Sequence, residues 1–509
     1  MKKLLLILLT AVLYLPAIAV DFNYTFEGQT LTYTILSAAD KTVMTKEGTN
    51  STAGNTVVGD LILPEKVQYN GENYTLTSIG YAAFYKSTGL TSVTIPATVT
   101  SIGNGAFLGC NGLTEVEIPA SVISIGEYAF TQCVRLASIK IPGSVKTIGT
   151  YAFFDCDNLK KVEISDLGAW CAISFEDMFA NPLFYAEHLY IDGSEIKNII
   201  IPDTVTSIGA FAFVYGVAVT SVEIPASVTS IGYLAFGYCS SLRSIVIPDS
   251  LTELGDFSFY ECSSMRTATL PTSITAIGAS VFTNCISLTK VNIPSSVTFI
   301  GKQAFYGCKS LKSIEIPGSV DDIDQSAFAY CTGLTSVKIP ESITVLRKFV
   351  FNYCSGLTDI EIPNTVDSIG YAALAYCSSL TEIEIPASVE IIGEGAFTDC
   401  TSLSSITCNA VTPPVCGDKA FDKVDKQTCY LYVPGESIEA YKKAYQWEDF
   451  VNLHAAGIGE AVIDYDVIDY PADVYNLWGA LLKRAASQDD VDAMAPGIYI
   501  VDGKKTLVK

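Results

Sequence analysis

The feature that most constrains the fold of this chain is a unit of 23 residues that is repeated along most of its length. Residues 90–110 read LTSVTIPATVTSIGNGAFLGC, and the same order of apolar, proline, glycine and aromatic residues returns every 23 residues. One such unit cannot bury its apolar face alone, so neighbouring units must stack into a solenoid. The apolar-proline pairs that mark the units begin at Ile95, Ile118, Ile141, Ile201, Ile224, Ile247, Leu270, Ile293, Ile316, Ile339, Ile362 and Ile385.

Each column of the repeat has a physical role. The phrase LxxVxI alternates apolar and polar residues, which is typical of a short strand that is half buried on a core. The proline that follows ends strand pairing because it has no N–H to donate, and a glycine column suits a tight turn. An aromatic column is expected to fill the interior, with Phe84, Phe107, Phe130, Phe153, Phe213, Phe236, Phe259, Phe282, Phe305, Phe328, Phe351 and Phe397.

The stretch IGxxAFxxCxxLxxVxI resembles the leucine-rich-repeat phrase LPxxxFxxLxxLxxLxL. More narrowly, it is similar to the BspA-type repeats of bacterial and protist surface proteins, over about residues 60–410. The resemblance implies a leucine-rich-repeat solenoid: a right-handed arc with a parallel β-sheet on the concave face, short strands and turns on the convex side, and small β-rich caps. It also implies a surface for protein–protein interaction.

The segments outside the repeat suggest five regions. Residues 1–19 have a positive start, an apolar run and a small-residue cleavage site, which predict a signal peptide. No cysteine directly follows that site, so we expect a secreted or cell-surface protein and not a lipoprotein. The expected divisions are 1–19 signal peptide, 20–60 N-terminal cap, 61–410 solenoid with a variant insert at 164–202, 411–455 C-terminal cap and 456–509 C-terminal β module.

Three of these regions carry more specific expectations. The insert is predicted to hold a hairpin that turns at Asp192-Gly193, either as a structural embellishment or as a projecting binding loop. In the C-terminal cap, Ser437, Tyr441 and Trp447 suggest a short helix that packs across the last turn. The final segment resembles the C-terminal sorting tails of secreted Bacteroidetes proteins through residues 496–499, although a plain structural β module is the alternative.

The fifteen cysteines do not read as a disulfide framework. Eleven share one column of the repeat, so we expect buried thiols that act as small hydrophobic residues. A zinc site would need ligands that converge from different directions. Cys408, Cys416 and Cys429 lie outside the column, and a disulfide within this group is left open. The column consists of Cys110, Cys133, Cys156, Cys239, Cys262, Cys285, Cys308, Cys331, Cys354, Cys377 and Cys400.

Composition and motifs exclude several functions. The net charge of −23 disfavours nucleic acid and anionic lipid as partners. The apolar run within residues 1–19 is too short to predict a membrane span, and no second candidate follows it. The chain has two histidines and no metalloprotease, nucleophile-elbow, P-loop or C-x-x-C motif. Only Cys171 and His188 could form a cysteine–histidine pair, so we expect no enzyme, no cofactor and no metal.

Two surface columns are candidate ligand contacts. The first is a charged set on the outward strand positions, and its acids could pair with lysines across strands, hold Ca²⁺ or meet a basic partner. The second is a set of tyrosines before the column cysteine, which could anchor a protein or sugar or could simply pack against neighbouring turns. The candidates are Glu315, Lys338, Asp359, Glu361, Glu382 and Glu384 in the first set, and Tyr330, Tyr353 and Tyr376 in the second.

The sequence therefore favours an adhesin-like binding protein whose concave surface engages an extracellular protein of a host matrix or a neighbouring cell. One alternative is a glycan-binding accessory protein of a carbohydrate-use system, which should expose aromatic rings beside polar groups. Another is a passive structural component of the cell surface, which should expose no clustered patch.

Overall fold

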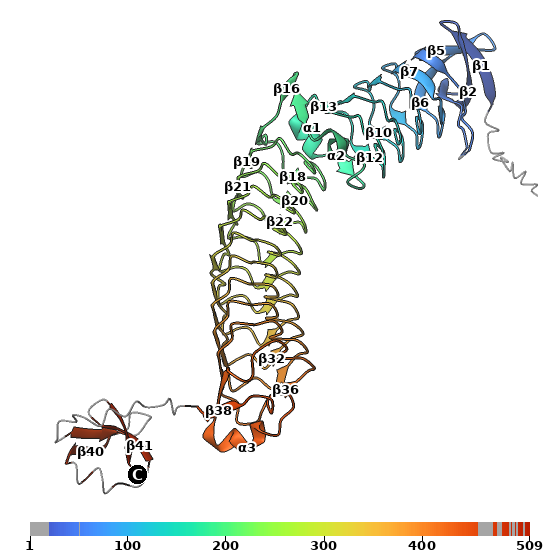
Figure 1. Cartoon of the computed structure of the whole chain (residues 1–509). Helices are drawn as coiled ribbons and strands as arrows, with labels where there is room; N and C mark the ends of the chain where they lie inside the picture. Colours follow the sequence, from blue (N-terminus) through green and yellow to red (C-terminus); the bar gives the residue numbers. More distant parts are fainter. Residues whose placement is uncertain are drawn as a thin grey trace, which may run out of the picture.

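The computed structural model describes residues 20–49, 51–456, 472–475, 481–487, 490, 494, 497–501 and 504–508. The signal peptide predicted at residues 1–19 lies outside them. Within residues 58–455 the chain is a parallel-strand solenoid of about 16 turns, which confirms the predicted fold class. Figure 1 shows the turns stacked one upon another along a bent rod.

The LxxVxI phrase of each turn forms a strand, and these long strands pair in parallel with their neighbours. Val93 lies opposite Val116, for example, so that the apolar residues of successive turns point into the core together. The long strands are β4 (Val58–Ile62), β7 (Gly89–Thr94), β9 (Glu115–Glu117), β11 (Ser138–Ile141), β13 (Lys161–Ile164), β15 (Leu189–Ile191), β17 (Asn198–Ile200), β19 (Ser221–Glu223), β21 (Ser244–Val246), β23 (Thr267–Thr269), β25 (Lys290–Asn292), β27 (Ser313–Ile314), β29 (Ser336–Lys338), β31 (Asp359–Glu361), β33 (Glu382–Ile385), β35 (Ser405–Cys408), β37 (Tyr430–Val433) and β38 (Asn452–Ala455).

A second set of parallel strands, each of two residues, precedes the glycine column. Figure 1 shows β18, β20 and β22 on the inner side of the bend, and β19 and β21 on the outer side. A parallel sheet therefore lines the inner side and the long strands lie on the outer side, but the inner sheet consists of the two-residue strands, which were expected on the convex side. These are β8 (Ser101–Ile102), β10 (Ser124–Ile125), β12 (Thr147–Ile148), β14 (Ser174–Phe175), β18 (Ser207–Ile208), β20 (Ser230–Ile231), β22 (Glu253–Leu254), β24 (Ala276–Ile277), β26 (Phe299–Ile300), β28 (Asp322–Ile323), β30 (Val345–Leu346), β32 (Ser368–Ile369), β34 (Ile391–Ile392) and β36 (Val415–Cys416).

The core lies between the two sets of strands and contains the columns that the sequence predicted. Rings of the phenylalanine column stack on one another, as with Phe305 and Phe328, whose centroids are 5.3 Å apart and nearly parallel. All fifteen cysteines are buried free thiols, so Cys408, Cys416 and Cys429 form no disulfide. Each column thiol donates to a backbone carbonyl of the preceding turn, as Cys285 Sγ does to Phe259 O at 3.3 Å. The thiols thus satisfy backbone acceptors inside the solenoid.

The insert forms the bend of the rod. It contains α1 (Leu167–Cys171), α2 (Leu183–Ala186) and a hairpin of β15 and β16 (Ser194–Glu195) that turns at Asp192-Gly193, as predicted. The long-strand sheet that starts at β4 ends at β16, and a new one starts at β17. Two buried side chains bridge this break, because Trp170 Nε1 donates to Ala212 O at 2.8 Å and Asn181 Nδ2 donates to Phe211 O at 2.8 Å.

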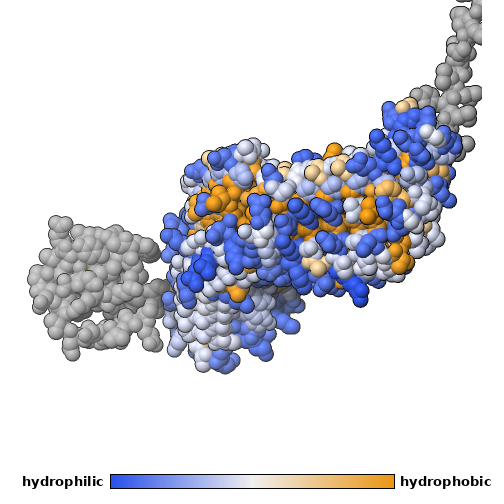
Figure 2. Space-filling model, turned by 90° about the horizontal axis from the view of Figure 1, so that it is seen from above, coloured by the Kyte–Doolittle hydropathy of each residue, from blue (hydrophilic) through white to orange (hydrophobic). Residues whose placement is uncertain are grey.

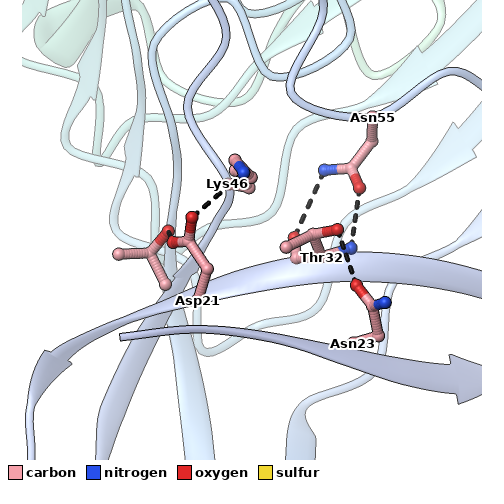
Figure 3. Close-up of polar contacts among 6 residues, drawn as sticks. Asp21, Asn23, Thr32, Lys46 and Asn55 are labelled. Atoms are coloured by element: carbon pink, nitrogen blue, oxygen red, sulfur yellow. Dashed lines mark hydrogen bonds and ion pairs between the residues drawn. The ribbon is translucent and has the colours of Figure 1, made fainter. Parts of the chain in front are cut away.

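The N-terminal end is closed by β1 (Asp21–Phe26), β2 (Gln29–Ser37), β3 (Thr42–Thr45), β5 (Lys66–Tyr69) and β6 (Glu72–Ile79), which extend the sheet of two-residue strands. The buried amide of Asn55 accepts a bond from Thr32 N at 2.8 Å and donates to Thr32 O (Figure 3). Lys46 pairs with Asp21 at 3.0 Å in the same region. These contacts hold the segment around Lys46 and Asn55 against β1 and β2, so that the N-terminal strands cover the end of the core.

At the other end a short helical segment, η1 (Gly435–Ser437) and α3 (Ile438–Tyr441), packs across the last turn, as predicted. Tyr441 and Trp447 are fully buried there. Beyond it, β39 (Ala472–Tyr475), β40 (Leu481–Ala486), β41 (Gly497–Val501) and β42 (Lys504–Val508) form a separate four-stranded sheet. None of the helices in the described residues is long and apolar enough to cross a membrane. The sorting role of the tail stays a prediction.

Candidate functional site

The outward residues of the long strands form the surface on which the charged candidates lie. Figure 2 shows hydrophobic residues gathered in a band along one face of the solenoid, with hydrophilic residues on both sides. The C-terminal part of the long-strand face instead carries a shallow groove of about 500 Å³. We call it the acidic groove, because its charged lining residues are Lys338, Glu341, Asp359, Glu361, Glu382 and Glu384.

The acidic groove holds five carboxylates and one lysine. Lys338 Nζ lies 2.7 Å from Glu361 Oε2, and this hydrogen bond raises the pKa of the lysine. Glu384 accepts a bond from Asn409 Nδ2 at 2.7 Å, which holds the carboxylate without neutralising it. Within the part of the chain that the structure describes, no basic side chain other than Lys338 lines the groove, so its other carboxylates have no cationic partner there. Its surface is therefore negative and suits a positively charged partner.

The structure brings together five of the six charged candidates and leaves Glu315 outside the groove lining. Cross-strand charge pairing is realised in part: Lys338 pairs with Glu361, the register neighbour on β31. The four acids of β31 and β33 are not arranged as ion ligands. No group of three or more His, Cys, Asp or Glu residues in the described part of the chain is placed to hold a metal ion.

An exposed ring cluster continues the same face beyond the acidic groove, and the sequence analysis missed it. Tyr430, Tyr432 and His454 lie on the last two long strands, with His454 at 5.7 and 5.8 Å from the two tyrosine rings. Tyr430 is in register with Ser405 and hence with Glu382 two strands away. The phrase YLYVP at residues 430–434 repeats the alternation of EIEIP at 382–386, and this signal could have located the cluster.

The tyrosine candidates occupy a different part of each turn. Tyr330, Tyr353 and Tyr376 are stacked with nearly parallel rings, at centroid distances of 4.5 and 4.0 Å. Each has a left-handed backbone, with φ between 58° and 63°. None of them lines the acidic groove. Because the rings cover one another's faces, the stack offers mainly ring edges and hydroxyl groups to a ligand.

The cysteine–histidine pair considered from the sequence has no chemical basis in the structure. Cys171 is fully buried, and burial raises the pKa of its thiol to about 12. A protonated, enclosed thiol is a poor nucleophile. His188 Nδ1 lies instead 2.5 Å from Glu195 Oε1 in the insert hairpin. The His188–Glu195 pair is thus a structural contact between β16 and the residue before β15.

The fold and the surface together define the class of leucine-rich-repeat proteins. The turns stack in parallel, each core column repeats the same residue type, and the outward positions vary. Within that class, the BspA type leucine rich repeat region matches residues 73–180, 187–312 and 298–428. The chain belongs to the BspA-type leucine-rich-repeat family.

Two solved structures illustrate the likeness. A leucine-rich repeat protein from Bacteroides ovatus is 30% identical, with a TM-score of 0.56, over 84% of this chain and 98% of that one. A leucine rich cell surface protein from Faecalibacterium prausnitzii is 26% identical, with a TM-score of 0.42, over 76% of this chain and 94% of that one. No curated protein matches the chain significantly.

Proposed function

We propose that this chain is a secreted or cell-surface adhesin-like protein that holds an extracellular protein on its long-strand face, without catalysis. The observation that carries the proposal is the acidic groove, where five carboxylates face one lysine on exposed strands. Parallel strands fix the spacing of these acids along the solenoid, so a partner with regularly placed Lys or Arg side chains can meet several at once.

The ring cluster supplies the second element of the binding surface. Tyr430 is 47% exposed, and Tyr432 and His454 lie beside it. Exposed tyrosines favour protein interfaces because a ring buries much area at a small cost in side-chain entropy. An arginine of the partner can pair with a carboxylate or stack on a tyrosine. The groove and the cluster together favour a basic protein segment that runs across the turns.

Paired charge-neutralising variants test this proposal. Glu382→Gln/Glu384→Gln changes both outward positions of β33, and Glu115→Gln/Glu117→Gln changes the equivalent positions of β9. Both variants, and the unaltered chain, would be applied to an array of purified extracellular matrix and cell-surface proteins. We expect the β33 variant to weaken saturable binding by about tenfold or more and the β9 variant to leave it unchanged.

Two outcomes would overturn the proposal. Absence of saturable binding to any protein on the array would favour a passive surface component. Equal losses from both variants would mean that binding follows total charge and not the acidic groove. A glycan as the partner has separate structural support at the opposite end of the solenoid.

A further inference from the structure

A small apolar pocket lies in the N-terminal arm, on the turns that carry the phenylalanine column. Its volume is about 320 Å³, at the lower end of ligand-pocket sizes. We call it the ring slot, because tyrosines supply most of its apolar wall. The residues that matter for its chemistry are Tyr81, Tyr85, Asn104, Gly105, Glu127 and Tyr128.

The ring slot is the place of a missing aromatic side chain. Gly105, Tyr128 and Tyr151 occupy the same position in three successive turns, and all have a left-handed backbone with φ of 61°, 55° and 56°. Tyr128 and Tyr151 stack at 5.5 Å with rings 7° apart. The stack ends at Tyr128 because Gly105 has no ring to place on it. A Cβ built on Gly105 would meet only the Leu108 side chain, at 3.8 Å or more.

One ring face of Tyr128 is therefore covered by Tyr151, and the other borders the slot. Tyr128 is 41% exposed, so a large part of its ring is accessible to a ligand. This differs from the Tyr330, Tyr353 and Tyr376 stack, where the middle ring is covered on both faces. Tyr128, as the last ring of its stack, thus presents one ring face to the pocket.

Polar groups stand at the rim of the slot. Asn104 Oδ1 accepts a bond from Glu127 N at 3.1 Å, which orients the amide and leaves its NH₂ end for a ligand. The Glu127 side chain is exposed and brings two acceptor oxygens. A flat ring with an apolar face and hydroxyl groups on its edge matches this arrangement: the face stacks on tyrosine, and the hydroxyls meet the amide and the carboxylate.

The charged groups near the ring slot distinguish between two possible ligands, a neutral sugar and an organic cation. Three tyrosines beside a carboxylate also resemble an aromatic cage. However, Lys86 Nζ already lies over the Tyr85 ring, 5.0 Å from its centroid. This lysine occupies a face of one of the lining tyrosines and repels a second cation, so the slot favours a neutral ligand.

We propose that the ring slot binds one pyranose ring of a neutral glycan, stacked on the free face of Tyr128 and hydrogen-bonded to Asn104 and Glu127. The site is independent of the proposed protein-binding function, because it shares no residue with the acidic groove. A single ring fits its size, and the open mouth allows the rest of a chain to extend outward.

The repeat itself supplies a matched pair of test variants. Gly105→Tyr places a ring in the slot at a backbone geometry that Tyr128 and Tyr151 already adopt. Gly395→Tyr makes the same change at the equivalent position of a C-terminal turn, where φ is 62°. Tyr128→Ala removes the stacking face. The probes are glucose, galactose, mannose, N-acetylglucosamine and their disaccharides, with choline as the cationic comparison, measured by saturation-transfer NMR on the full chain.

We expect at least one neutral sugar to bind, with affinity lowered about tenfold or more by both Gly105→Tyr and Tyr128→Ala and unchanged by Gly395→Tyr. Thermal unfolding would establish that each variant folds; if Gly105→Tyr does not, Tyr128→Ala and Glu127→Gln decide the result. Binding of choline alone, binding of no sugar, or sugar binding that survives a filled slot would each overturn the proposal.

Discussion

The two arms of the solenoid share one core and differ in almost everything outside it. In the N-terminal arm, β4 to β16, the long strands form one seven-stranded sheet; in the C-terminal arm, β17 to β38, they form sheets of two to four strands. The N-terminal long-strand face has a shallow patch with three glutamates and two lysines. The corresponding C-terminal surface is the acidic groove, with five carboxylates and one lysine.

This comparison separates what the fold demands from what it leaves free. The buried columns must fill the same space in every turn, so phenylalanine and cysteine recur with little change on both sides of the bend. The outward positions meet only solvent and their cross-strand neighbours, where a substitution costs little. Charge and aromatic content on those positions can therefore vary by arm, and we place the binding functions there.

The largest expected effect is at the bend, where the two arms are joined. Trp170 is 1% exposed, packs against Phe175 at 5.2 Å and donates to Ala212 O. Trp170→Ala should lower the free energy of unfolding by about 3–5 kcal/mol, through the cavity it leaves. Trp170→Phe keeps most of the packing and should cost only ~1 kcal/mol for the lost hydrogen bond, because Asn181 Nδ2 still donates to Ala212 O at 3.1 Å.

Chemical denaturation of both variants measures this difference. Because the arms share a continuous core only through the insert, Trp170→Ala should also split unfolding into two transitions. Hydrogen exchange assigns each transition to an arm. A single cooperative transition with an unchanged midpoint would show that the arms are coupled by something other than the Trp170 contacts.

The cysteine column should make the C-terminal arm the more sensitive to alkaline pH. Burial raises the pKa of Cys239, Cys331 and Cys400 to about 12. An unfolded thiol ionises near pH 9, so above that pH the unfolded chain loses thiol protons that the folded chain keeps. This stability is fully present below about pH 9 and is lost as pH rises toward 12. Eight column cysteines lie in the C-terminal arm and three in the N-terminal arm.

Hydrogen exchange of the two arms at pH 7 and at pH 10, corrected for intrinsic rates, tests this expectation. Protection should fall further in the C-terminal arm. Equal losses in the two arms would mean that tyrosine ionisation or general charge repulsion, and not the thiols, controls alkaline unfolding.

The interior of this protein follows from its sequence, and its surface sites follow only in part. The 23-residue period predicts which residues are buried, because the same positions of every stacked turn face the core. The short strands were expected on the convex side, but they lie on the inner side of the bend; strands such as Ser101–Ile102 are too short for alternation to predict their place. The ring slot was missed because it depends on an absent side chain at Gly105. The column position is visible in the sequence, but the open face of Tyr128 is a property of packing.

The charged candidates show the same limit. Lys338 and Glu361 were expected to pair because their columns align, and they do. Glu315 occupies the same column but lies outside the groove lining, since the depression forms only where the side chains of several turns leave room. Spacing predicts which residues share a face, whereas the shape of that face depends on every neighbouring side chain.

The smallest effect comes from the single lysine of the acidic groove. Lys338→Gln removes an exposed ion pair with Glu361, which solvent screens, and should leave the stability of the fold nearly unchanged. It also removes the only cation among five carboxylates. An oligoarginine peptide should then bind about two- to threefold more tightly at low salt, with a smaller gain near 0.15 M salt because exposed charges are screened.

Lys140→Gln is the matched change in the N-terminal patch, where Lys161 still pairs with Glu163 at 2.6 Å. It should leave peptide binding unchanged, since the remaining lysine keeps part of the patch neutral. If both variants raised affinity equally, the peptide would be sampling the net charge of the whole chain. A gain confined to Lys338→Gln would instead localise the attraction to the acidic groove, where unpaired carboxylates on fixed strands make the arms chemically different.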